Sequence, residues 1–100
     1  MGMNDNVLIS KGVISGNGGN GLAVMAGQDF TLIDCEVGNN QRHGIYLGQE
    51  VDNVKMVKSV IAGNGFKDGS LRGYGVLSNT ESLCLADCDV SLNALGNVYI

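Results

Sequence analysis

The stretch Val54-Lys-Met-Val-Lys-Ser-Val-Ile-Ala-Gly-Asn64 decides the fold, because three other segments of the chain align with it without a gap. They begin at Val7, Phe30 and Leu83, so that successive copies start 23, 24 and 29 residues apart. A unit that recurs at this spacing is typical of a solenoid, in which each coil packs only against its neighbours. The sequence therefore predicts a single domain over residues 1–100, built from about four stacked coils.

Apolar and polar residues alternate within each copy, which indicates a strand with one buried face. The apolar columns are Val7, Phe30, Val54 and Leu83; Ile9, Leu32, Met56 and Leu85; and Ile14, Val37, Ile61 and Val90. A column of small residues lies two positions before the third of them: Gly12, Cys35, Ser59 and Cys88. We expect a tight bend at this column. A further, mainly apolar strand follows each copy, at residues 22–24, 45–47, 76–78 and 98–100.

Two polar columns are predicted to be structural ladders. The first is Asn17, Asn40, Asn64 and Asn93, whose side chains could hydrogen-bond to one another along the stack. The second is Lys11, Asp34, Lys58 and Asp87, whose charges alternate in sign. Rungs about 4.8 Å apart would place each charge between two opposite ones. We therefore expect a solvated charge ladder that helps to fix the register, in preference to a carboxylate site.

The turn after each ladder asparagine also follows a pattern. Gly21 and Gly44 come four residues after the asparagines of the first two copies, and Asn97 takes the matching place in the last copy. Both residue types accept a positive φ, so left-handed backbone is expected there. In the third copy Gly75 follows Asn64 by 11 residues instead of four, so seven residues are inserted. Residues 66–74 are therefore predicted to bulge out as a loop.

The composition argues against several classes of function. A formal net charge of −4 is unlike that of a nucleic-acid-binding surface. No segment approaches the roughly 18 consecutive apolar residues of a membrane-spanning helix, so membrane insertion is not expected. Residues 1–10 lack the basic-then-apolar profile of a signal peptide. We expect synthesis in the cytoplasm, although within a longer parent protein the domain could reach a virion or the cell exterior.

The three cysteines, Cys35, Cys84 and Cys88, are too few for a disulfide framework and lack the spacing of a zinc site. We expect buried or half-buried thiols in a reducing compartment. Acidic residues that could bind calcium recur two coils apart, as Asp34 and Asp87 do, which is too far for one metal cage. No metal and no other cofactor is therefore predicted.

A leucine-rich repeat is the main rival architecture, because the columns of Ile9, Gly12, Ile14 and Asn17 also fit its spacing. Its second leucine position, however, holds only Gly, Cys and Ser here. A leucine-rich repeat also has one strand in each turn, whereas each copy in this chain has apolar alternation on both sides of the asparagine. The pattern favours a β-helix.

The segments Arg42-His-Gly-Ile-Tyr-Leu-Gly48, Asp52-Asn-Val54 and Val60-Ile-Ala-Gly-Asn-Gly65 resemble the repeats of pectate-lyase-like proteins. That family includes polysaccharide lyases, polygalacturonases, alginate epimerases and phage tailspikes. The resemblance covers nearly the entire chain and implies an all-β, single-stranded, right-handed parallel β-helix. It implies little about activity. Asn20 stands where the similar polygalacturonases have a catalytic Asp, and the Pro-containing motif of the epimerases is absent.

One cluster remains as a candidate site. It consists of Arg42, His43 and Tyr46, together with Lys67, Asp68, Arg72 and Tyr74 from the insertion. As a sugar-acid site, it would use His43 and Asp68 for proton transfer and Arg42 to hold a carboxylate. Lys67, Arg72, Tyr46, Tyr74 and Tyr99 would bind the ligand. The alternative is an ordinary turn histidine beside an exposed polar loop.

The outward column Ala23, Tyr46, Leu77 and Tyr99 suggests contact with a glycan or with another β-helix, as in the trimeric tailspikes that the chain resembles. The predicted function is a β-helix module of a tailspike-like or surface protein, acting in glycan binding, homo-oligomer assembly or both. The alternative is a part of a lyase, hydrolase or epimerase that acts on acidic polysaccharide. Unpaired strand edges at both ends of the stack also predict that the chain is either a fragment of a longer protein or an oligomer that covers its ends by self-association.

Overall fold

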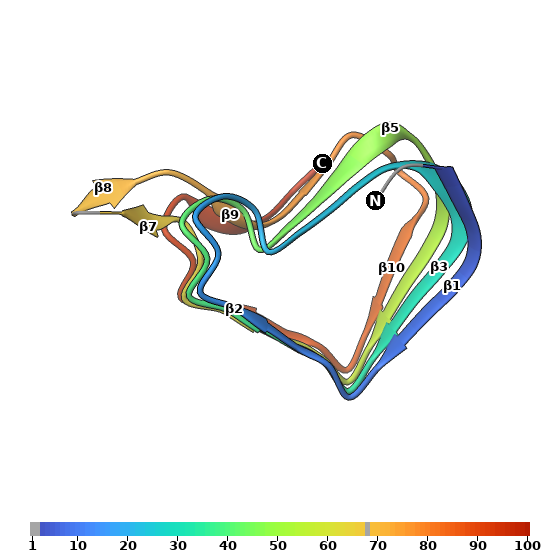
Figure 1. Cartoon of the computed structure of the whole chain (residues 1–100), viewed down its shortest axis with the longest axis horizontal. Coiled ribbons are helices and arrows are strands. Elements are labelled where there is room, and N and C mark those ends of the chain that lie inside the picture. Colours follow the sequence, from blue (N-terminus) through green and yellow to red (C-terminus); the bar gives the residue numbers. More distant parts are fainter. Residues whose placement is uncertain (1–2, 68) are drawn as a thin grey trace.

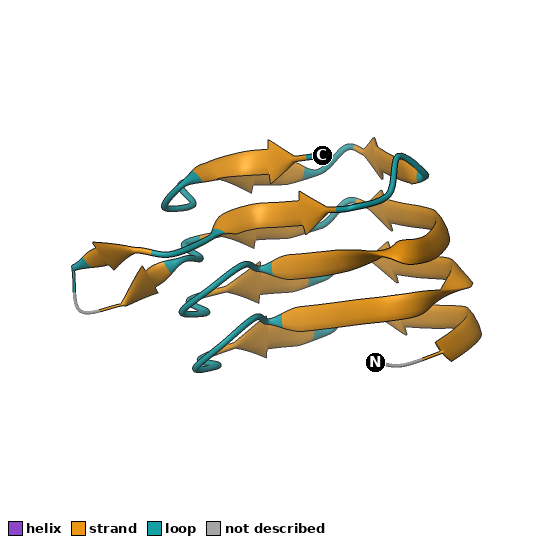
Figure 2. Ribbon diagram, turned by 90° about the horizontal axis from the view of Figure 1, so that it is seen from above, coloured by secondary structure: helices purple, strands orange, loops and turns teal. Residues whose placement is uncertain are grey.

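The aligned copies stack as successive coils of a parallel β-helix in the computed structural model, which describes residues 3–67 and 69–100 (Figure 1, Figure 2). Phe30 pairs with Val7 on one side and with Val54 on the other, and Leu83 pairs with Val54. Val37 likewise lies between Ile14 and Ile61. Each coil contributes strands to two sheets, which excludes the leucine-rich repeat. The predicted all-β fold class and the alignment of the copies are confirmed.

The strands of the described residues form three sheets. The six-stranded parallel sheet contains β1 (Met3–Ser10), β3 (Leu22–Ile33), β5 (Ile45–Val57), β9 (Tyr74–Ser78), β10 (Leu83–Ala86) and β12 (Gly96–Tyr99). The four-stranded parallel sheet contains β2 (Val13–Ser15), β4 (Glu36–Gly38), β6 (Val60–Ala62) and β11 (Asp89–Ser91). The antiparallel pair of β7 (Phe66–Lys67) and β8 (Ser70–Leu71) projects from the side of the stack (Figure 1).

The six-stranded sheet bends sharply, so that the coil has three sides when viewed along the stack (Figure 1). The bend lies at a column of residues with left-handed backbone, Asn6, Asp29 and Asn53, with φ of 57°, 60° and 55°. The Asn53 side chain donates a hydrogen bond to Asp29, and the Asn53 N–H donates to Ser82 Oγ at 2.8 Å. Asn and Asp tolerate this conformation better than other residues with a Cβ, which explains the polar residue just before each first apolar column.

The charged column occupies the next corner. Lys11, Asp34, Lys58 and Asp87 are all exposed and all have left-handed backbone, with φ between 50° and 56°. The N–H groups of the first three donate to carbonyls one coil further along, at 2.9–3.0 Å. Their side chains form no ion pair within the described part of the chain. The column is therefore stacked as predicted, but backbone hydrogen bonds rather than ion pairs join its rungs.

The column of small residues lies beside this corner, on the inner side of the coil. Cys35 and Ser59 are each 1% exposed. The Cys35 thiol donates to Ile9 O at 3.3 Å, and Ser59 Oγ accepts from the Cys35 N–H at 3.2 Å. Cys88 makes the equivalent contact to Met56 O at 3.1 Å. Cys84 is exposed, so the expectation of a buried or half-buried thiol is wrong there. It lies between the inward positions of β10 and therefore points outward.

The asparagine column is a continuous hydrogen-bonded ladder. Asn17, Asn40 and Asn64 each donate from Nδ2 to Oδ1 of the asparagine in the next coil, at 2.8, 2.9 and 2.9 Å. Their backbone N–H groups donate to the same oxygens at 3.0–3.3 Å. Asn40 and Asn64 are 1% and 0% exposed, and no buried side-chain polar atom among the described residues lacks a partner. The ladder thus satisfies the polar groups of a turn that the fold buries.

The glycines after the ladder have a different role from the predicted one. Gly21, Gly44 and Gly75 do not have positive φ. A Cβ at Gly44 would instead lie 2.7 Å from Asn64 Nδ2 and 2.7 Å from Gly75 O. The expectation of left-handed backbone is therefore wrong: these positions are glycine because the ladder of the next coil leaves no room for a side chain. Asn97 lies on β12, beyond which no described coil is stacked, so its side chain does not meet a further ladder residue.

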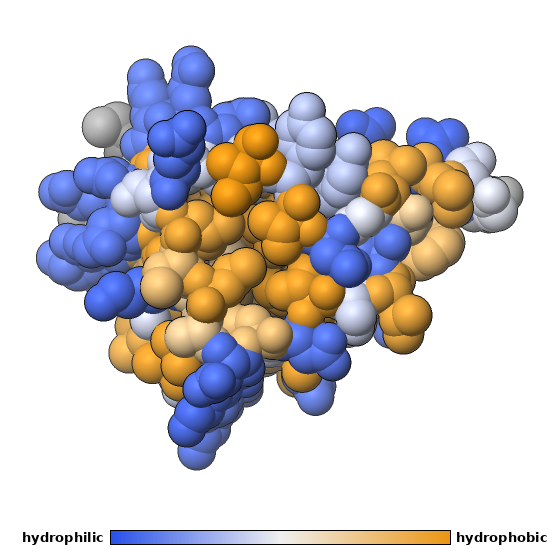
Figure 3. Space-filling view, turned by 180° about the vertical axis from the view of Figure 1, so that it is seen from behind, coloured by the Kyte–Doolittle hydropathy of each residue, from blue (hydrophilic) through white to orange (hydrophobic). Residues whose placement is uncertain are grey.

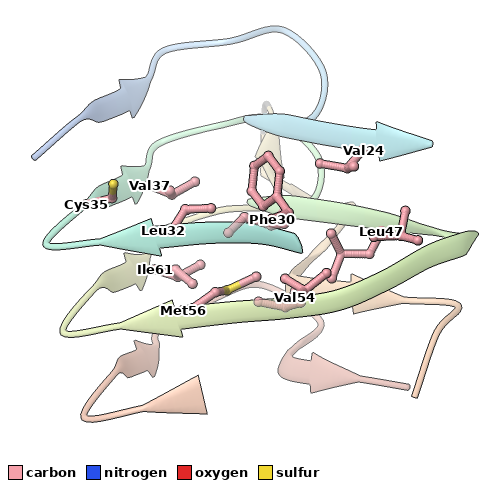
Figure 4. Close-up of a cluster of buried hydrophobic side chains, with 12 residues drawn as sticks. Val24, Phe30, Leu32, Cys35, Val37, Leu47, Val54, Met56 and Ile61 are labelled. Carbon is pink, nitrogen blue, oxygen red and sulfur yellow. The ribbon is translucent and has the colours of Figure 1, made fainter. Parts of the chain in front are cut away.

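The core fills the space between the sheets with side chains from every apolar column (Figure 4). Leu32, Met56 and Ile61 are fully buried, and Phe30 and Val54 are 2% and 1% exposed. These residues lie in the middle coils, where each one packs against copies of itself above and below. The matching positions in the end coils are only partly covered. No helix long and apolar enough to cross a bilayer is present in the described residues.

Candidate functional site

His43 lies in the turn between the asparagine ladder and β5, and hydrogen bonds to both neighbouring coils hold it. Its own N–H donates to Asn20 Oδ1 at 3.1 Å, and its Nδ1 accepts the N–H of Tyr74 at 3.0 Å. Asn20, His43 and Tyr74 therefore stack as one column, in which a side-chain acceptor receives the N–H of the next coil. Asn20 was not foreseen in this role, although it takes the place of His43 one coil earlier.

Four rings form a continuous aromatic row on this side of the stack: Tyr46, His43, Tyr74 and Tyr99. The His43 ring lies 6.2 Å from Tyr46 and stacks at 5.9 Å on Tyr74, with an interplanar angle of 10°. Tyr74 and Tyr99 are 5.2 Å apart. Gly96 allows this arrangement, since a Cβ there would lie 3.2 Å from the Tyr74 ring. Tyr99 is exposed, and the other three are half-buried.

The electrostatics of the turn favour a neutral imidazole. Burial lowers the pKa of His43 from its ordinary value of 6.5, and the positive charge of Arg42 lowers this pKa further. Because Nδ1 accepts the Tyr74 N–H, the proton of the neutral ring is on Nε2. His43 therefore presents a hydrogen-bond donor from the row.

Acidification is expected to weaken the fold through His43. Its folded-state pKa is below that of the unfolded chain, so the stability that the neutral ring contributes is complete above about pH 6.5 and is lost as the pH falls through the folded-state pKa. Protonation also turns Nδ1 into a donor facing the Tyr74 N–H. In His43→Asn, position 43 has the residue found one coil earlier. When the pH is lowered from about 8 to about 5.5, the melting temperature of this variant should decrease less than that of the parent. Equal decreases for both proteins would contradict this assignment.

The insertion is anchored directly beside the His43 turn. The Arg72 N–H donates to Gly65 O at 2.6 Å, and Gly73 packs against the backbone of the turn. A Cβ at Gly73 would lie 2.6 Å from the backbone nitrogen of His43. This close contact explains why position 73 is a glycine, which the sequence did not indicate. The base of the insertion thus places Arg72 and Tyr74 on the coil next to Arg42 and His43. The β7–β8 pair extends outward and carries Lys67 away from the turn (Figure 1). The predicted Asp68 lies outside the described residues.

The outward column lies where the sequence placed it. Ala23, Tyr46, Leu77 and Tyr99 occupy paired positions of four successive strands. The first three are half-buried rather than fully exposed. Tyr46 Oη accepts a hydrogen bond from Asn79 Nδ2 at 3.0 Å, a partner that the sequence reasoning did not identify. Asn79 follows β9 directly and so brings a polar group to the aromatic row.

No cluster of three or more potential metal ligands occurs within residues 3–67 and 69–100. A family model described as "Right handed beta helix region" matches residues 1–100. The chain belongs to the right-handed β-helix family. No curated protein and no solved structure matches it significantly. The membership agrees with the handedness that the resemblance to pectate-lyase-like proteins implied, and it names the fold of this β-helix without assigning it an activity.

Proposed function

We propose that this β-helix binds an acidic polysaccharide along the aromatic row. The single observation that carries the proposal is the row itself, in which neighbouring rings of Tyr46, His43, Tyr74 and Tyr99 lie 5.2–6.2 Å apart across three successive coils, with Tyr46 and His43 on the same one. Aromatic side chains offer rigid apolar surface against which the C–H groups of a sugar can pack. A row of several rings matches a polymer of such units.

Polar groups at the edge of the row can recognise sugar hydroxyls. The Nε2–H of His43 is a donor, and the Tyr46 hydroxyl is already oriented by Asn79. Tyr74 and Tyr99 add two more hydroxyl groups. Apolar faces with a few placed polar groups are the usual composition of a ligand-binding surface.

The preference for an acidic polymer rests on two arginines. Arg42 and Arg72 are both exposed, and their segments pack together through Gly73. A guanidinium group can form two parallel hydrogen bonds with a carboxylate. The chain has a net charge of −4, so these arginines supply local positive charge on an otherwise acidic protein. A uronate polymer would place its carboxylates beside the row.

Affinity electrophoresis in gels that contain polygalacturonate or alginate tests the proposal, with dextran as the neutral comparison. The chain should be retarded by at least one uronate polymer. Tyr46→Ala and Tyr99→Ala should each weaken this binding about tenfold, because each removes one ring contact. Val13→Ala, which truncates an exposed side chain on the other sheet, is the control and should bind as the parent does. Absence of retardation in every gel, or unchanged binding by both tyrosine variants, would reject the proposal.

Cleavage of the polymer is the second candidate function. It would require His43 to take up or release a proton, with Arg42 holding the carboxylate. The Nδ1 of His43 already accepts the Tyr74 N–H, which favours binding by His43 over proton abstraction. Incubation with the same uronate polymers distinguishes the two functions, since a lyase would release unsaturated products and a binding module would leave the polymer intact.

A further inference from the structure

The middle coils carry apolar residues on the outer surface of one side, which lies between the bend and the charged corner. On this side β3 and β5 pair in register, and their buried positions alternate with four that point outward: Thr31, Ile33, Lys55 and Val57. These four residues define the outer side. Ile33 and Val57 are paired neighbours, and both are half-exposed. In Figure 3, apolar side chains lie beside the polar ones that project at the charged corner, at the bottom of the view. Apolar surface of this kind suggests contact with a partner.

Two opposite charges border the outer side at the corner. Asp34 follows β3 directly, and Lys58 follows β5. Both side chains are exposed on neighbouring coils, yet they form no ion pair with each other or with any other residue of the ranges 3–67 and 69–100. Each charge is therefore available to a group of another molecule.

The opposite border of the outer side is also polar. Asp29 of β3 lies beside Asn53 of β5, whose side-chain amide donates a hydrogen bond to the Asp29 carboxylate. At both borders, β3 thus supplies an acidic residue and β5 supplies a residue that complements it.

A second copy of the chain matches this pattern. Identical surfaces face each other across a two-fold axis, and here the axis can run either along the strands or along the stack. An axis along the strands, between β3 and β5, places Asp34 of each copy opposite Lys58 of the other. It also forms three further pairs without like charges: Asp29 with Asn53, Ile33 with Val57, and Thr31 with Lys55.

The other arrangement is disfavoured by charge. An axis along the stack reverses the strands and brings each coil against the same coil of the second copy. Asp34 would then lie opposite Asp29 of the other copy, which places two carboxylates together. The charges at the two borders therefore select the arrangement in which the stacks run in opposite directions.

We infer that two copies of this β-helix associate side by side through the outer side, with their stacks antiparallel. Contacts between Ile33 and Val57 form the centre, and Asp34–Lys58 pairs lie at the rim, which is the usual arrangement of a protein interface. The contact joins identical surfaces, so it stops at a dimer. Because the outer side is small, the dimer should form only at high protein concentration. Neither the aromatic row nor a bound carbohydrate takes part in this contact.

Sedimentation velocity at protein concentrations up to millimolar tests the dimer with two charge variants of the full chain. Asp34→Lys and Lys58→Asp each place like charges together twice in the dimer, and each should raise the concentration needed for association about tenfold. An equimolar mixture of the two variants should associate as the parent does, because every rim pair of the mixed dimer is again opposite in charge. Both positions have left-handed backbone, and the same column accepts Lys and Asp in that conformation. Circular dichroism confirms that each variant is folded.

Val57→Thr tests the apolar centre of the interface. It keeps the branched shape that suits a strand but adds a hydroxyl group, so association should weaken several-fold. Val60→Thr is the matched control, since Val60 is 41% exposed on the outer surface of the four-stranded sheet. This variant should associate as the parent does.

Three results would overturn the inference. The first is a parent chain that stays monomeric at millimolar concentration. The second is association that continues to trimers or to open-ended chains. The third is a mixture of the two charge variants that associates no better than either variant alone. A dimer of the parent, loss of association in both charge variants and its recovery in their mixture would establish the antiparallel contact.

Discussion

Replacing Asn64 with alanine is expected to lower the free energy of unfolding by at least about 3 kcal/mol. The Asn64 side chain accepts from the N–H and Nδ2 of Asn40 and donates to Asn93 Oδ1 and Val37 O, at 2.9–3.3 Å. Asn64 is fully buried, so no water can replace these contacts. Each buried polar group left without a partner costs about 1–3 kcal/mol. Urea denaturation at a fixed protein concentration measures the loss.

Asn17→Ala is the matched control, because Asn17 belongs to the same ladder but is exposed at its end. It donates to Asn40 Oδ1 at 2.8 Å, and its backbone N–H, which the substitution retains, donates to the same oxygen at 3.2 Å. We expect a loss of less than about 1 kcal/mol. Equal losses for the two variants would show that the ladder contributes through asparagine turn propensity alone and not through its buried hydrogen bonds.

Replacing Gly44 with alanine should destabilise the fold by about 3 kcal/mol, the upper part of the usual range for overpacking. The added methyl group would lie 2.7 Å from a neighbouring carbonyl oxygen and 2.7 Å from the amide of Asn64. Gly44 is buried, the Asn64 amide is held by two hydrogen bonds and the carbonyl belongs to the backbone of Gly75, so neither can move aside at low cost. The melting temperature and the urea midpoint should both decrease, with native β-sheet content retained at low temperature.

Gly19→Ala provides the comparison for this substitution. Nothing lies within 4 Å of a Cβ at Gly19, and its φ is outside the left-handed region. Replacing such a glycine by alanine reduces the freedom of the unfolded chain, so a stability equal to that of the parent or slightly above it is expected. A decrease at Gly19 as large as that at Gly44 would refute the steric explanation for the glycine column.

The sequence predicted the fold well because solenoid contacts repeat. Phe30, Val37 and Asn40 each contact the equivalent residues of the next coil. An alignment of the copies therefore also predicts which residues of neighbouring strands are paired. The sequence could not distinguish between different physical reasons for having a given residue at a position. A glycine selected for positive φ and one selected for lack of space look the same in a sequence, and Gly44 was assigned the wrong reason. The bend at Asp29 was missed because its column contains Asn, Asp and Ser, which any turn accepts.

The candidate site was harder to predict because it depends on where the insertion returns to the stack. His43 and Tyr74 were grouped correctly, but the contact between Nδ1 and the Tyr74 N–H follows from the close packing of Gly73 on the turn. Single-residue interactions of this kind do not repeat from coil to coil. For the same reason, no column of the alignment pointed to Asn79 as the partner of Tyr46.

The insertion makes the length and sequence of a segment beside the aromatic row independent of the register of the coils, although in a small domain the two are usually coupled. The chain leaves the third coil at Gly65 and re-enters the stack at Gly73, and the backbones of these two glycines are in direct contact. The main chain therefore closes across the base of the insertion, and the pairing of Ile45 with Val76 continues as though residues 66–72 were absent. Natural variation or deliberate grafting can change the length and sequence of this segment beside the aromatic row without altering the register of the coils.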